Sequence, residues 1–94
     1  MRIRRSGRFE QELGEIVDYI AKDKKSAAKA FNRSLQFAIE TLADHPNKGR
    51  SNDDGYRELV YKGYTIPYLV DDENIVILGI FNQNGWKFNS SNNS

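Results

Sequence analysis

The sequence contains no cysteine, a single histidine, two prolines and no long hydrophobic run. The absence of cysteine excludes disulfides and thiolate metal sites, and nothing indicates an oxidising compartment. The arginines at the start of the chain are followed by Glu10 and Glu12 rather than by an apolar segment, so we expect no signal peptide and no membrane span. These absences predict a cytoplasmic protein that needs no cofactor.

The length of the chain limits it to one domain. The 94 residues leave no room for a second hydrophobic core. We expect the domain to occupy residues 1–88. Residues 89–94 contain only asparagine and serine, a composition that predicts a disordered tail.

Charge is nearly balanced, with a formal net charge of +1, so the chain is not a polycation that coats nucleic acid. Basic residues nevertheless cluster in two places: Arg2, Arg4, Arg5 and Arg8, then Lys22, Lys24, Lys25 and Lys29. Acidic residues concentrate between these clusters: Glu10, Glu12, Glu15 and Asp18. Such runs are typical of a solvated surface, and the alternative is contact with an acidic partner, either nucleic acid or protein.

Two stretches of the chain carry apolar residues at helical spacing. They are Phe9, Leu13, Ile16, Val17 and Ile20, then Phe31, Leu35, Ala38, Ile39 and Leu42. This spacing predicts a hairpin of two amphipathic helices. The first should cover residues 7–22 with Ser6 as its N-cap, residues 23–25 should form the turn, and Ser26 should cap the second helix, which ends before Pro46.

After the second helix the composition changes. Residues 46–55 are rich in glycine, asparagine and aspartate, and they predict a surface loop. Residues 56–61 and 64–70 read as two strands joined by a tight turn at Lys62 and Gly63. Residues 75–81 form an almost unbroken apolar run, which is typical of a central strand covered on both faces.

Residues 1–5 complete the expected sheet, because Ile3 between arginines suits an edge strand with one buried side chain. The order therefore predicts an α+β fold in which a helical hairpin packs on an antiparallel three-stranded sheet that the N-terminal strand joins. Pro67 lacks a backbone donor, so its strand should carry a bulge or leave that position unpaired.

Three segments of the chain resemble the RelE/ParE superfamily of type II toxin–antitoxin toxins, and in particular its ParE-like branch. These segments are "IVDYIAKDKKSAAKAFNRSL", "LADHPNKGR" and "YRELVYKGYTIPYLVDDENIVILGIF". Together they cover most of residues 16–81, in the order and spacing of the family. The resemblance implies a bacterial toxin that a separate antitoxin holds inactive, as in plasmid stabilisation systems.

The resemblance leaves two targets open. ParE-like members are associated with poisoning of DNA gyrase by binding, without a catalytic site of their own. RelE-like members are ribosome-dependent endoribonucleases of mRNA that use Lys, Arg and Tyr side chains without a metal. Residues 82–85 here read Asn-Gln-Asn-Gly, without the arginine and terminal tyrosine of that pattern. We therefore expect a gyrase-binding toxin, with the nuclease as the alternative and a non-toxic DNA- or protein-binding module as the weaker alternative.

Each hypothesis assigns particular residues. The residues proposed to bind the target are Arg50, Arg57, Trp86 and Lys87. A nuclease would use Arg50, Arg57, Lys62, Tyr68 and Lys87. The antitoxin is expected to contact Tyr19, Ala27 and Ala30 beside the helical hairpin, and any DNA contact would come only through the antitoxin. No His or acidic pair has metal-ligand spacing.

Overall fold

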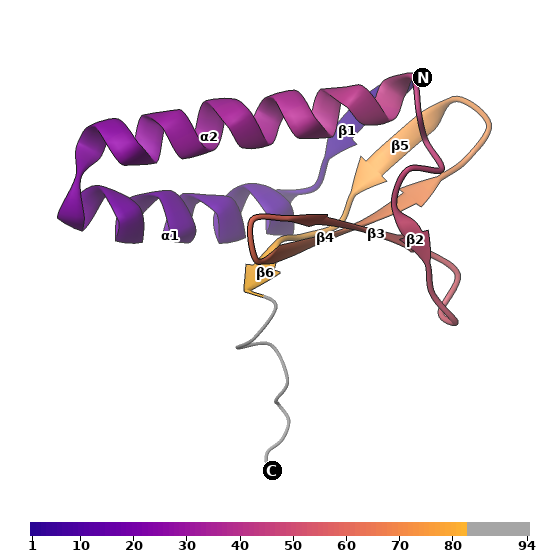
Figure 1. Ribbon diagram of the computed structural model, residues 1–94. Coiled ribbons are helices and arrows are strands. Elements are labelled where there is room, and N and C mark those ends of the chain that lie inside the picture. The colour runs from indigo at the N-terminus through magenta and orange to yellow at the C-terminus, as the bar shows by residue number, and fades with distance from the viewer. Residues whose placement is uncertain (83–94) are drawn as a thin grey trace, which may run out of the picture.

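The computed structural model describes residues 1–82 and has the expected α+β architecture (Figure 1). Its elements are β1 (Arg2–Arg5), α1 (Gly7–Asp23), α2 (Lys25–Glu40), a 3-10 turn (Thr41–Ala43), β2 (Arg50–Ser51), β3 (Arg57–Tyr61), β4 (Tyr64–Val70), β5 (Asn74–Ile77) and β6 (Phe81–Asn82). The boundary expected at residue 88 and the Asn/Ser tail lie outside the described residues.

The two helices form the expected hairpin, but the joint between them is shorter than predicted. Ser6 caps α1 as expected, because its Oγ accepts a hydrogen bond from the N–H of Phe9 at 3.0 Å. The prediction that Ser26 caps α2 was wrong, since α2 already begins at Lys25. Lys24 alone serves both helices: its N–H donates to the carbonyl of Ile20, and its carbonyl accepts from the N–H of Ala28.

The hydrophobic core lies between this hairpin and one face of the sheet, and Figure 1 shows the helices on the same side of the strands. Side chains from every layer are almost fully buried there: Phe9, Leu13, Leu35, Ile39, Leu42, Leu59, Ile66, Tyr68, Ile75, Ile77 and Ile80. Each buried Leu, Ile or Phe contributes about 1.5–3 kcal/mol through removal of apolar surface from water. The ring of Phe31 also packs edge-on against Tyr64, with centroids 5.4 Å apart.

The sheet is mixed, with the strand order β1-β5-β4-β3-β2. The expected antiparallel meander is present, because β3 pairs with β4 and β4 pairs with β5 in antiparallel fashion. The N-terminal strand joins at an edge, where it runs parallel to β5 and places Ile3 opposite Ile75. The turn between β3 and β4 falls at Lys62 and Gly63 as predicted, with φ values of 48° and 84°. Positive φ at both positions is typical of a type I′ hairpin turn.

The apolar run 75–81 does not form the single two-sided strand that its composition predicted. Strand β5 ends at Ile77, and its side chains alternate between buried and partly exposed positions. The following residues leave the ladder opposite Pro67, whose carbonyl accepts from the N–H of Leu78 at 2.8 Å. Pro67 cannot donate in return, and the carbonyl of Leu78 instead accepts from the hydroxyl of Ser6 at 3.0 Å. Two residues further on, the N–H of Ile80 donates to a carboxylate oxygen of Glu12 at 3.0 Å. Pairing with β4 resumes at β6.

Candidate functional site

The loop between the 3-10 turn and β3 is fixed to the core side of the sheet by Tyr68. The hydroxyl of Tyr68 donates to the carbonyl of Pro46 and accepts from the N–H of Gly49, both at 2.8 Å. Its side chain is fully buried. Burial raises the pKa of Tyr68, against the opposing effects of the Gly49 N–H and the nearby Arg57 charge. The phenol therefore stays protonated and able to donate to Pro46 at neutral pH.

Gly49 is required where this loop meets the sheet. A Cβ atom at this position would lie 2.7 Å from the carbonyl oxygen of Glu58 and 2.7 Å from the side chain of Tyr68. Both neighbours are held in the sheet, so a larger residue would displace the loop. This contact gives a physical reason for the glycine in the segment Pro-Asn-Lys-Gly-Arg.

Arg57 makes a second attachment on the same face, since it lies directly opposite Tyr68 in the β3–β4 register. Its Nη1 donates to the carbonyl of Gly49 at 2.6 Å and approaches the carbonyl of Asn47 at 3.4 Å. An arginine on a strand is often paired with an acidic side chain across the sheet. The described structure provides backbone carbonyls instead, so Arg57 braces the loop.

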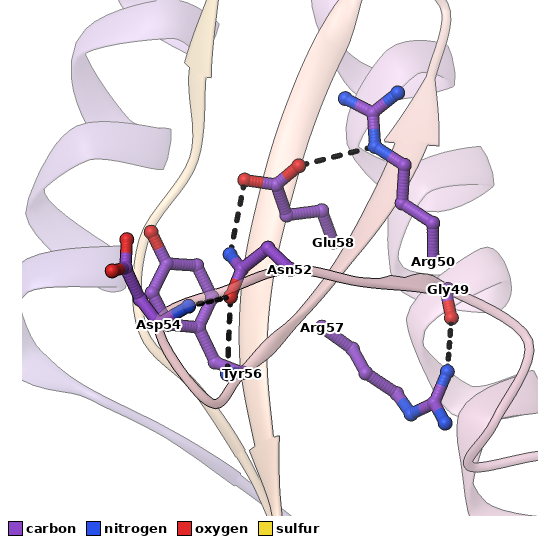
Figure 2. Close-up of polar contacts among 7 residues, drawn as sticks. All are labelled: Gly49, Arg50, Asn52, Asp54, Tyr56, Arg57 and Glu58. Carbon is purple, nitrogen blue, oxygen red and sulfur yellow. Dashed lines mark hydrogen bonds and ion pairs between the residues drawn. The ribbon is translucent and has the colours of Figure 1, made fainter.

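The opposite face of the sheet carries a separate polar network centred on Glu58 (Figure 2). Strand alternation places Glu58 on the other side from Arg57, as expected. One carboxylate oxygen of Glu58 accepts from Nε of Arg50 at 3.1 Å, and the other accepts from the side-chain amide of Asn52 at 3.4 Å. Arg50 and Glu58 are direct partners in the β2–β3 ladder, so their side chains form a cross-strand ion pair.

Asn52 extends this network into the tip of the loop. Its side-chain oxygen accepts hydrogen bonds from the N–H groups of Asp54 at 2.9 Å and Tyr56 at 3.3 Å. An Asn side chain that bonds backbone groups two and four residues ahead fixes a tight turn. The segment predicted as one surface loop is therefore interrupted by β2 and held on both sides.

The four described nuclease candidates do not meet in one cleft. Tyr68 and Arg57 are engaged with the loop on the core side, whereas Arg50 pairs with Glu58 on the opposite face. Lys62 lies in the hairpin turn at the far end of β3, with its Nζ 5.5 Å from the ring centroid of Tyr61. Lys62 follows Arg57 by five positions along extended chain, which corresponds to about 16 Å.

The remaining predicted residues are distributed differently. Trp86 and Lys87 lie outside the described residues. The predicted antitoxin contacts Tyr19, Ala27 and Ala30 are all exposed, and 73% of the Tyr19 surface is accessible. Phe37, which the sequence reasoning did not select, is exposed to the same degree, at 72%.

The sequence did not reveal that Tyr68 holds the loop by hydrogen bonds. It also did not reveal that Glu58 and Asn52 join β2, β3 and the loop in one hydrogen-bond network. A signal for Tyr68 was present, because its alternation with Ile66 predicts an inward-facing side chain. A buried tyrosine hydroxyl usually has a hydrogen-bond partner. Its partner belongs to a segment about twenty residues earlier, which local pattern cannot identify.

The described residues contain no group of three or more His, Asp or Glu side chains placed to hold a metal ion. Within the same part of the chain, neither helix is long and apolar enough to cross a membrane. The fold and the site together define a small α+β protein in which a helical hairpin covers one face of a mixed sheet. A loop held by Tyr68 and Arg57 places Arg50 at the edge of that sheet.

The chain belongs to the ParE toxin family of type II toxin–antitoxin systems, since the model of that family, described as the ParE toxin of the parDE system, matches residues 3–84. A solved chain of the chromosomal ParDE TA system from P. aeruginosa has a similar fold, with a TM-score of 0.75. The two chains are 22% identical, and the match covers 87% of this chain and 95% of the other. No curated protein matches the sequence.

Proposed function

We propose that this protein is a toxin that acts by binding DNA gyrase and that a cognate antitoxin neutralises it. Membership of the ParE family supports the toxin class. The observation that carries the binding mechanism is the separation of Arg50 from Arg57, Tyr68 and Lys62. Cleavage of RNA requires a base, an acid and a charge-stabilising group around one phosphate. In this structure two of the four groups are engaged in holding a loop.

The proposed target surface includes Arg50 on the edge strand β2, and Trp86 and Lys87, which lie outside the described residues, are further proposed contacts. Arg50 is the described member of this surface that faces solvent, with 61% of its side chain accessible. Arginine and tryptophan are enriched among residues that dominate binding energy at interfaces. Truncation of either is expected to cost roughly 1–3 kcal/mol of target binding.

The antitoxin is proposed to contact the exposed face of the helical hairpin at Tyr19, Ala27 and Ala30. Amphipathic helices of partner proteins commonly bind to helical surfaces through their apolar side chains. Both partners act in the cytoplasm in this proposal. A neighbouring small protein that neither co-purifies with this chain nor suppresses its toxicity would contradict the assignment of an antitoxin.

The deciding experiment is expression of the chain in cells, followed by measurement of both possible outcomes. The gyrase hypothesis predicts DNA breaks and inhibited supercoiling by purified gyrase, with intact mRNA on translating ribosomes. The nuclease hypothesis predicts site-specific mRNA cleavage that Arg57→Ala or Lys87→Ala abolishes in a folded protein. Cleavage of this kind would overturn the binding mechanism.

A further inference from the structure

The Arg50–Glu58 pair leaves the outer end of the Arg50 guanidinium available. The pair uses Nε of Arg50, at 3.1 Å from the Glu58 carboxylate. Neither Nη group of Arg50 has a partner among the described residues, and Figure 2 shows them directed away from Glu58. Two parallel N–H donors at the end of a guanidinium match the two oxygens of a carboxylate.

Glu58 is itself fixed on both sides. Its side chain is only 19% accessible, compared with 61% for Arg50. Asn52 donates to its second oxygen, and that amide is in turn anchored by the backbone N–H groups of Asp54 and Tyr56. Glu58 is therefore an oriented carboxylate on a strand, whereas Arg50 projects from the edge of the sheet.

We propose that Glu58 is a positioning residue that presents Arg50, end-on and pre-oriented, to a carboxylate group of the target protein. A long arginine side chain normally loses conformational freedom when it binds, and holding Nε in advance reduces that loss. The inference rests on the proposed function, because it takes gyrase as the target.

The local charge favours a single carboxylate over the phosphates of a nucleic acid. Asp53 and Asp54 lie in the same loop, and Glu58 already offsets part of the Arg50 charge. A track of phosphates is usually bound by several cations together. A single arginine fits one acidic side chain on a protein surface better than a row of phosphates.

The test is a series of full-length variants measured for affinity to purified DNA gyrase and for thermal stability. Arg50→Ala is expected to weaken gyrase binding roughly thirtyfold, and Arg50→Lys roughly tenfold because lysine has no fork to bridge Glu58 and the target. Glu58→Ala should weaken binding roughly fivefold, whereas Glu58→Gln, which keeps an acceptor oxygen for Nε, should restore affinity to within about twofold.

A double-variant cycle separates positioning from a structural effect. Glu58→Ala should cause no further loss in the Arg50→Ala background, because Glu58 acts through Arg50. If Glu58 merely neutralised Arg50, Glu58→Ala would bind gyrase as tightly as the wild type or tighter, and the proposal would be wrong. A loss of affinity that Glu58→Gln does not rescue would also overturn it.

The remaining outcomes are distinguishable. If the wild type binds gyrase but the Arg50 and Glu58 variants bind equally well, this inference fails and the proposed function stands. If the wild type does not bind gyrase, both fail. If the Arg50 dependence disappears when DNA is omitted from the gyrase sample, the contact is to phosphate and the carboxylate assignment is overturned.

Discussion

Removal of the Tyr68 hydroxyl is the sharpest test of how the loop is held. Tyr68→Phe keeps the buried ring but deletes the group that joins Pro46 and Gly49 at 2.8 Å. The N–H of Gly49, which lies at a buried position, then loses its partner. An unsatisfied buried donor costs about 1–3 kcal/mol, so we expect a loss of about 2 kcal/mol in the free energy of unfolding. For a domain of this size that corresponds to a fall in Tm of roughly 10 °C.

The assay is chemical and thermal unfolding of Tyr68→Phe beside a matched control. Tyr61→Phe is suitable, because the hydroxyl of Tyr61 makes no hydrogen bond within the described residues and its removal should change stability little. Amide exchange at Gly49 should accelerate in the first variant and not in the second. A loss below about 0.5 kcal/mol with unchanged exchange at Gly49 would show that the hydroxyl does not hold the loop.

Three further predictions concern backbone and protonation. Gly49→Ala should destabilise the fold by about 1–3 kcal/mol in urea unfolding, because the added Cβ would lie 2.7 Å from atoms of Glu58 and Tyr68. An unchanged unfolding midpoint would contradict this prediction. Lys62→Asn should stabilise by about 0.5 kcal/mol, because asparagine adopts the positive φ of 48° more readily, and a lower Tm would count against it. Burial raises the pKa of Tyr68 in the folded protein above the ordinary tyrosine value of 10. The contribution of Tyr68 to the free energy of unfolding is therefore complete below pH 10 and is lost as the pH rises through the pKa of the folded protein. Wild-type stability should therefore fall above pH 10 more steeply than that of Tyr68→Phe, and parallel pH profiles would refute the assignment.

A comparison of Arg50→Ala with Arg57→Ala distinguishes target contact from bracing. Arg57 donates to the carbonyl of Gly49, and loss of a charged donor to a backbone acceptor costs about 1.5–3 kcal/mol of stability. The exposed pair of Arg50 with Glu58 contributes at most about 1 kcal/mol. We expect Arg57→Ala to lower Tm and toxicity together, and Arg50→Ala to lower toxicity with little change in Tm. The reverse pattern would exchange the two roles.

Local chemistry in the sequence determined the fold class and most of its joints. Helical spacing of apolar residues defined the hairpin, a serine before the first turn defined its start, and Lys62 with Gly63 defined the type I′ turn. The placement of Arg57 and Glu58 on opposite faces of β3 also followed from alternation alone. These features depend on neighbours within a few residues or on strand periodicity, so a single sequence contains the information.

Only the tertiary structure decided which polar residues are committed to the fold. Tyr68 and Arg57 had the chemistry of a catalytic or binding site, and their engagement with Pro46 and Gly49 depends on the approach of a distant loop. At the interruption after Ile77, Pro67 offers no donor, and the groups that bond the strand there, the Ser6 hydroxyl and the Glu12 carboxylate, lie far away in the sequence. The sequence shows which polar groups are able to form hydrogen bonds, whereas the tertiary structure determines which of these groups come within bonding distance.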